Sequence, residues 1–277
     1  MNGQRPPAVA GAFYPGTAAR VRSALDGLLG SGAPTRERVP GALVPHAGWA
    51  YSGAVAAEVY RRIEIPATVL LLGPNHTGLG AEISVWSGDA WRTPAGDAAI
   101  DEDLRDAILR LAPGAEADRG AHEREHSLEV QVPFLLRIRP DVRIVPVAIA
   151  PAPAARLVSL GEGLAKALKA ANAGDPHPPG PALILISSDM DHFHSHEEVL
   201  RIDAPALSRL EALDPVGLLE ACERDDIGMC GVHPAVAGMS ALRALGATRR
   251  EILAHKTSRD AGGDADRTVG YAAVLFR

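Results

Sequence analysis

The sequence is poor in aromatic residues and in cysteine. Phe, Trp and Tyr make up 4% of its 277 residues, and its only cysteines are Cys222 and Cys230. With so few aromatic rings, the core is expected to consist mainly of Ala, Val, Leu and Ile. Two cysteines cannot form a disulfide framework, which favours a reducing, cytoplasmic location.

The chain also lacks the features of membrane and nucleic-acid-binding proteins. No apolar run reaches about 18 residues, so no membrane span is expected. The start, MNGQRPPAVAGAFYPG, has no charged region followed by an apolar one, so no signal peptide is expected. A net charge of −6 gives no electrostatic attraction to nucleic acid or to an anionic membrane. A hydrophobic content of 47% nevertheless predicts a soluble globular protein with a sizeable core.

What the sequence does contain is an alternation of strand and helix patterns. Short apolar runs predict buried strands at Gly41–Val44, Ala67–Leu72, Val142–Ile149, Ala182–Ile186 and Thr268–Phe276. Helical periodicity covers Thr17–Leu29, Asp101–Leu111, Leu157–Ala171, Val199–Leu213, Val216–Asp225 and Pro234–Leu245. The Pro- and Gly-rich stretch Ala170–Pro181, which includes His177, is expected to be a surface loop. We therefore predict an α/β fold in a single domain over residues 1–277, with a mostly parallel or mixed sheet covered by helices on both faces.

Histidine is the one unusually frequent residue type, with ten copies. His46, His76 and His192 each lie just beyond the carboxyl end of a predicted strand. In open α/β sheets, ligands bind in the crevice outside those ends, so these imidazoles are expected to converge. Three converging imidazoles suit Fe(II), Zn(II) or Cu. The spacing leaves open which of them bind metal and which acts as an acid–base group.

Each cysteine has its own interpretation. Cys222 falls on the apolar face of a predicted helix and is interpreted as a small core residue. Cys230 precedes a predicted helix within the sequence GMCGVHP. A helix N-terminus favours the thiolate, which is a strong soft metal ligand. The sequence alone leaves Cys230 open between a ligand and a core residue.

The segment His122–His126 (HEREH) matches two metallopeptidase patterns, H-E-x-x-H and H-x-x-E-H. Both patterns need a helix that places the two histidines on one face. Helical periodicity begins only near Ser127, which is a candidate helix cap, and Pro133 implies a kink or a late first turn. A peptidase centred on His122 and His126 is therefore disfavoured.

Further polar residues surround the third histidine. Asp189 is a candidate for orienting His192 as a base, whereas Asp191 is expected to be a solvated loop residue. His194 and His196 are expected to lie on the surface at the start of a helix.

Taken in order, the motifs PAVAGAFYPG, VPHAGWAYSG, LLGPNHTG, EHSLEVQVPFL, SSDMDHF, CGVHP and VGYAA resemble those of the Memo-like family, in bacteria called AmmeMemoRadiSam system protein B. The resemblance spans almost the whole chain. That family is similar in fold to the class III extradiol ring-cleaving dioxygenases, which hold non-haem Fe(II). By this resemblance, His46, His76 and Cys230 would be the metal ligands. His192 would be the acid–base histidine, with Asp189 beside it.

The resemblance also implies Fe(II) as the first choice of metal, with Cu and Zn as alternatives. Glu125 and His126, in the family pattern EHSLE, would line the crevice or contact substrate. The alternative for both residues is that they stabilise the start of the following helix. The implied partners are a small-molecule or peptide ligand in the crevice, an AMMECR1-like protein and a radical SAM protein. No nucleic acid or membrane is expected as a partner.

Two main hypotheses for function follow. The first is a non-haem iron oxidoreductase of dioxygenase type. The second is a non-catalytic metal-handling or peptide-binding module that uses the same crevice. A zinc metallopeptidase built on His122 and His126 is the third and weakest hypothesis.

Overall fold

Four parallel strands form the centre of the sheet in this computed structural model, which describes residues 3–30, 36–172 and 182–277. Their order is β8 (Arg143–Ile149), β3 (Thr68–Pro74), β9 (Leu183–Ser187) and β2 (Gly41–Val44). All four are almost wholly buried and rich in Val, Ile and Leu, as expected for parallel strands covered on both faces. Their parallel pairing brings their carboxyl ends to one edge of the sheet.

The sheet becomes mixed on both sides of this centre. Beyond β2 lie the antiparallel neighbours β12 (Thr268–Phe276), β11 (Arg250–Thr257) and β10 (His192–His194). Beyond β8 lie β6 (Gly96–Ile100), β5 (Ala90–Thr93), β1 (Gln4–Arg5), β4 (Ile83–Trp86) and β7 (Ala115–Asp118). The observed architecture confirms the predicted α/β class.

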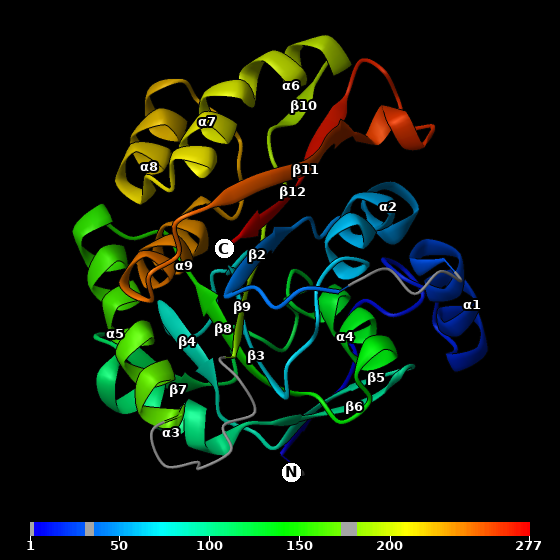
Figure 1. Cartoon of the computed structure of the whole chain (residues 1–277). Coiled ribbons are helices and arrows are strands. Elements are labelled where there is room, and N and C mark those ends of the chain that lie inside the picture. The colour runs from blue at the N-terminus through cyan, green and yellow to red at the C-terminus, as the bar shows by residue number, and fades with distance from the viewer. Residues whose placement is uncertain (1–2, 31–35, 173–181) are drawn as a thin grey trace.

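Helices cover both faces of the sheet and enclose a hydrophobic core on each (Figure 1). One core is formed with α3 (Glu102–Leu111), α5 (Ala154–Asn172), α7 (Ala204–Ala212), α8 (Pro215–Arg224) and α9 (Val232–Ala244). The other is formed with α1 (Ala18–Leu29), α2 (Trp49–Tyr60) and α4 (Val132–Ile138). Side chains along β9 alternate between the two cores: Ile184 and Ile186 face the first core, and Leu183 and Leu185 face the second.

The helices differ from the sequence prediction in two places. Helix α2 has no counterpart among the predicted helices, because its residues are apolar on nearly every side and show no amphipathic period. The single helix predicted over Val199–Leu213 is two helices, α6 (His196–Ile202) and α7. Pro205, in the first turn of α7, has no backbone N–H to continue a helix from α6.

The segment that follows the HEREH motif starts its helix late. Turns lead through Leu128 into a short 3₁₀ helix, η1 (Glu129–Gln131), and then into α4, with Pro133 in the first turn. The late first turn is confirmed. The expected cap is wrong, because Ser127 Oγ donates to Pro74 O, 3.3 Å away, and Leu128 precedes η1. Of the predicted loop Ala170–Pro181, residues 173–181 with His177 lie outside the described residues.

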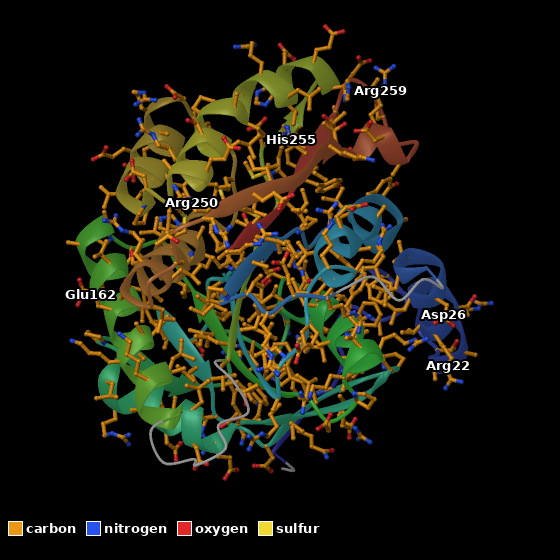
Figure 2. All side chains as sticks on the ribbon, viewed as in Figure 1. Arg22, Asp26, Glu162, Arg250, His255 and Arg259 are labelled. Carbon is orange, nitrogen blue, oxygen red and sulfur yellow. The ribbon has the colours of Figure 1, made fainter. Side chains whose placement is uncertain are left out.

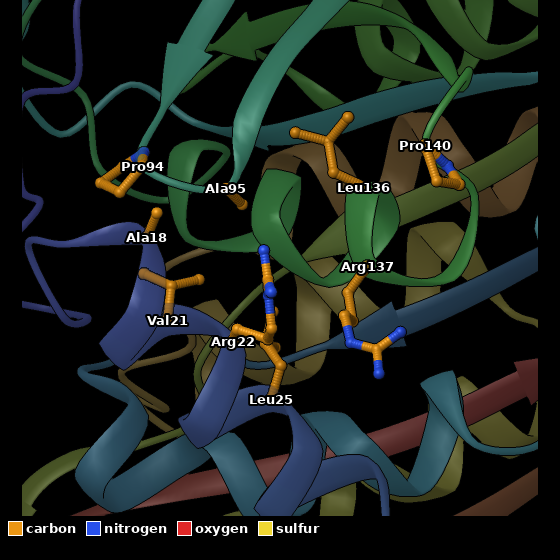
Figure 3. A pocket seen from close by; sticks show the side chains of 9 residues that line it. All are labelled: Ala18, Val21, Arg22, Leu25, Pro94, Ala95, Leu136, Arg137 and Pro140. Atoms are coloured by element: carbon orange, nitrogen blue, oxygen red, sulfur yellow. The ribbon is translucent and has the colours of Figure 1, made fainter.

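Arg22, Asp26, Glu162 and Arg259, labelled in Figure 2, lie at the periphery of the molecule. A groove of about 430 Å³ lies between α1, α4 and the β5–β6 turn (Figure 3). It is lined by Ala18, Val21, Arg22, Leu25, Pro94, Ala95, Leu136, Arg137 and Pro140. This lining has no histidine, cysteine or carboxylate, so the groove offers no metal ligands. Within the described residues, no helix is long and apolar enough to cross a membrane.

Candidate metal centre

The carboxyl edge of the central strands brings together residues from distant parts of the chain. His46 follows β2, His76 follows β3, and Cys230 lies in the turn before α9. The ligand atoms of these three residues all lie within 4.8 Å of one another. Cys230 Sγ is 3.1 Å from His46 Nε2. Two imidazoles and one thiol therefore converge just beyond the carboxyl edge of the sheet.

The ring of His46 is oriented by Ser187, the last residue of β9. The Ser187 hydroxyl donates to Ser127 O at 2.7 Å and accepts a hydrogen bond from Gln131 Nε2 at 3.0 Å. Its proton is thus already used, so its 3.0 Å contact with His46 Nδ1 requires an Nδ1–H donor. His46 is consequently held as the Nδ1–H tautomer, and the lone pair on its Nε2 is free and faces Cys230.

His46 is also kept neutral. It is 1% exposed, and burial lowers its pKa to about 3, with a further contribution from the neighbouring His76. A neutral imidazole with a free Nε2 is the form that binds a metal ion.

The ring of His76 is oriented by Glu125. One carboxylate oxygen accepts the backbone N–H of His76 at 2.6 Å, and the other contacts its Nδ1 at 2.9 Å. Burial by itself raises the pKa of Glu125, but its interactions with His76, Ser127 and His126 together outweigh that effect, and the pKa falls to about 2. The charged carboxylate favours the Nδ1–H form of His76 and leaves Nε2 free.

These residues fit a first-row transition metal ion. In protein metal sites, the second nitrogen of a ligating histidine is usually hydrogen-bonded, which fixes the ring and its tautomer. Both His46 and His76 meet this condition, through Ser187 and Glu125. A donor set of two imidazoles and a thiolate suits Fe, Cu or Zn.

Cys230 is the residue that metal binding would change most. Burial and the charge of Asp189 raise the pKa of its thiol, although a backbone hydrogen bond to Asp189 opposes the shift. Because His46 Nε2 carries no proton, the Cys230 thiol is the donor in their 3.1 Å contact. Metal binding must therefore displace this proton. Cys222, by contrast, is a buried core residue, as predicted.

Asp189 and His192 come from the loop after β9. Asp189 Oδ1 accepts the backbone N–H groups of His46 at 2.7 Å and Ala47 at 3.2 Å, which ties the His46 loop to this strand end. Burial raises the pKa of Asp189, and its hydrogen bond from the His46 backbone opposes that shift. His192 Nδ1 lies 2.8 Å from Gly228 O, so Nδ1 is the donor and Nε2 is free. Donor atoms of Asp189, His192 and Cys230 also lie within 4.8 Å of one another.

His126 lies at the same point, although the sequence left its role open. Its ring stacks on that of His76 at 4.7 Å and lies 5.4 Å from that of His46. Burial is the main cause that lowers its pKa to about 4. Together with His76 and Glu125 it forms a further group of close donor atoms.

His122 lies apart from this cluster. It is fully buried between the rings of Trp86 and Trp91, each 5.8 Å away, and its Nε2 bonds to Ser84 O. The segment from His122 to His126 is a series of turns and not a helix. Within the described residues, no group of three close donor atoms includes His122. The geometry that a metallopeptidase motif needs is absent from this segment.

The expectation that Asp191 is a solvated loop residue is wrong. Asp191 is 1% exposed, and its carboxylate accepts the backbone N–H of Gly228 and contacts His194 Nδ1 at 2.6 Å. Since Gly228 also accepts from His192, Asp191 holds the Cys230 loop against the His192 loop. His194 is exposed as expected, and His196 bonds to Thr257.

Sequence reasoning missed several residues that shape the site. Ser187 and Gln131 set the His46 tautomer, and Phe13 packs on His126 with ring centroids 4.6 Å apart. Ser187 lies within the SSDMDHF motif, and Gln131 within EHSLEVQVPFL. Membership in a motif was thus the only sequence signal for their roles.

The chain is similar over nearly its whole length to proteins of one family. The model of the family described as Memo-like protein matches residues 5–275. A MEMO1 family protein of Aquifex aeolicus is 43% identical over 273 residues, covering 98% of each chain. Others from Methanopyrus kandleri and Methanobrevibacter smithii are 36% and 38% identical, covering 99% of each chain. The chain therefore belongs to the Memo-like protein family.

Proposed function

We propose that this protein binds one transition metal ion through His46, His76 and Cys230 and uses it as a metal-dependent oxidoreductase. Fe(II) is the first choice, with Cu and Zn as alternatives. The observation that carries the proposal is the matched orientation of the two histidines. Each has its Nδ1 engaged and its Nε2 free. One ring nitrogen of each lies within 4.8 Å of the Cys230 sulfur. When bound, iron would supply one-electron redox chemistry and Lewis acidity.

The protein's own part in such a reaction centres on His192. Its Nδ1–H is fixed on Gly228 O, so its Nε2 can take a proton from a substrate hydroxyl and return it later. A carboxylate oxygen of Asp189 lies within 4.8 Å of a ring nitrogen of His192, and Asp189 also holds the backbone of the His46 loop. His192 is half-buried, which leaves the group accessible to a ligand.

The ligand is expected to enter from the side of His76 and His126. The His76 side chain is 33% exposed and that of His126 is 23% exposed, whereas His46 is buried. A small molecule or a peptide side chain entering here would meet the partly exposed side chains of His126 and His76 before the metal. Glu125 is fully buried behind them, so its role is to orient His76 and not to contact the ligand.

A second candidate function is non-catalytic metal handling. It is favoured by Cys230, because a thiolate ligand is soft and open to oxidation beside iron and oxygen. The same three ligands would then hold Cu or Zn without turnover. The expected AMMECR1-like and radical SAM partners remain predictions, and co-purification with the native protein is their test.

The two functions are separated by loading the protein with Fe(II) under anaerobic conditions and then measuring O₂ uptake with a panel of catechols. The first proposal predicts one bound equivalent and O₂ uptake with at least one catechol. His192→Gln should keep the metal and lose about 10²-fold or more of the rate. His196→Gln is the matched control, because His196 is a half-buried histidine that bonds to Thr257. This variant should keep both the bound metal and the rate of O₂ uptake. Metal binding without O₂ uptake supports metal handling, and no binding refutes both functions.

A further inference from the structure

The N-terminal arm, residues 3–16, is fastened to the interior by Arg5. Strand β1 pairs with β5 at the sheet edge, and the Arg5 side chain is 0% exposed. Its guanidinium lies 4.1 Å from the ring centre of Trp91. A buried guanidinium must have hydrogen-bond acceptors, and where they lie shows what the residue holds in place.

All three guanidinium nitrogens of Arg5 point at one segment of the chain. Nε donates to His122 O at 2.7 Å, Nη2 to Glu125 O at 2.6 Å, and Nη1 to Glu129 Oε2 at 2.7 Å. Arg5 therefore holds the backbone of the segment His122–His126 at His122 and at Glu125, from more than 100 positions away in sequence.

Glu129 in turn binds residues of the N-terminal arm. Its carboxylate accepts the backbone N–H groups of Ala8 at 2.7 Å and Val9 at 3.1 Å, and the hydroxyl of Tyr14 at 2.8 Å. Glu129 is also 0% exposed, so its charge is balanced by Arg5 inside the protein. We call Arg5, Glu129 and Tyr14 the arm clamp.

The arm also reaches the site directly. The ring of Phe13 packs on His126 at 4.6 Å, and His126 stacks on His76 at 4.7 Å with planes 16° apart. Phe13 is itself fixed, because its carbonyl accepts the backbone N–H of Trp49 at 2.8 Å. The arm thus contacts the segment His122–His126 from two sides, at its backbone and at its last ring.

This segment carries Glu125, whose carboxylate orients His76. We propose that the N-terminal arm, through Arg5 and Phe13, positions the segment His122–His126 and so sets the orientation of His76 at the metal centre. The inference rests on the proposed function insofar as His76 is a metal ligand. Arg5 and Phe13 are positioning residues, since neither is among the donor atoms of the site.

The test measures the tautomer of His76 in the metal-free protein by long-range ¹H–¹⁵N NMR, and metal affinity separately. Arg5→Lys keeps the charge but cannot place three donors in a planar fork. We expect the single Nδ1–H form of His76 to become a mixture of tautomers, and metal affinity to fall about tenfold. Glu125→Gln, which removes the charged acceptor itself, should give the same NMR change with the arm intact.

Leu160→Ala is the matched control for lost stability. Leu160 is fully buried in the core on the other face of the sheet, so this variant should be destabilised with the His76 spectrum unchanged. If Arg5→Lys resembles Leu160→Ala in leaving His76 and metal affinity unchanged, the proposal is overturned and the arm clamp only stabilises the fold.

Phe13→Leu keeps the proposal testable if Arg5→Lys does not fold. It removes the ring contact with His126 while the arm clamp stays in place. We expect shifted His126 ring signals and weaker metal binding, and unchanged signals and affinity would overturn the proposal. The NMR measurements need no metal, so a wild-type protein that binds none would refute the proposed function without deciding the role of the arm.

Discussion

Ser187→Ala is the sharpest test of how the site is built. The hydroxyl of Ser187 has a separate partner in each of His46 Nδ1, Gln131 Nε2 and Ser127 O, and all of these groups are buried. Removing it leaves a ring N–H, an amide N–H and a carbonyl unpaired. An unpaired buried polar group costs about 1–3 kcal/mol, and relaxation recovers part of it, so we expect a loss of about 3 kcal/mol in the free energy of unfolding.

The same substitution should weaken metal binding, because the His46 ring loses the contact that fixes its tautomer. The expected effect is about a tenfold rise in the metal dissociation constant. Urea unfolding followed by circular dichroism measures the first quantity, and competition with a coloured chelator measures the second.

Ser240→Ala is the matched control. Ser240 is also buried, but its hydroxyl donates only to Val236 O in its own helix, where the carbonyl keeps its helical partner. It should cost less than about 1 kcal/mol. If Ser187→Ala costs no more than Ser240→Ala, or if its metal dissociation constant is unchanged, the tautomer argument is refuted.

Three further predictions concern residues outside the metal centre. Hydrogen bonds from Ala121, Ser84 and Gly120 outweigh the effect of burial and lower the pKa of Asp118 from 3.8 to about 2. The stability that the charged Asp118 contributes is therefore present above pH ~4 and is lost as the pH falls through 2. Asp118→Asn should therefore lower the free energy of unfolding by about 2 kcal/mol at pH 7 and by almost nothing at pH 2, and an equal loss at both pH values in urea unfolding would contradict this. Phe193 has a positive φ of 71°, in the irregular pairing of β10 with β12. Phe193→Gly should therefore unfold at nearly the wild-type urea concentration, whereas Phe193→Val should lose about 1–2 kcal/mol in the free energy of unfolding. A Val variant as stable as the Gly variant would argue against backbone strain at this position. His122→Phe should leave the metal dissociation constant within twofold of wild type in the chelator assay, since His122 packs between Trp86 and Trp91; a large rise would make His122 part of the metal centre.

The sequence was sufficient to predict the edge of the sheet where the site lies. Apolar runs located β2, β3 and β9, and parallel strands in an α/β sheet end at one edge, so placing His46, His76 and His192 together needed no contact information. Helix α2 was missed because a helix buried on nearly all sides carries no amphipathic pattern.

The contacts that orient the site could not be predicted in the same way. Ser187 acts on His46 across 141 positions, and Arg5 acts on Glu125 across 120. Hydrogen bonds over such separations leave no periodicity in the sequence, and a serine at a strand end is common without such a role. Asp191 was misjudged for the same reason, since its burial depends on the distant Gly228 loop.

The most direct test of the central claim is metal analysis of the protein purified without chelators or a metal-affinity tag. The two cysteines provide an internal comparison, because Cys230 faces His46 at 3.1 Å while Cys222 is buried in the core. We predict about one metal ion per chain in the wild type and in Cys222→Ser, and a strongly reduced content in Cys230→Ser. Equal metal content in Cys230→Ser and the wild type would contradict the assignment of His46, His76 and Cys230 as the metal centre.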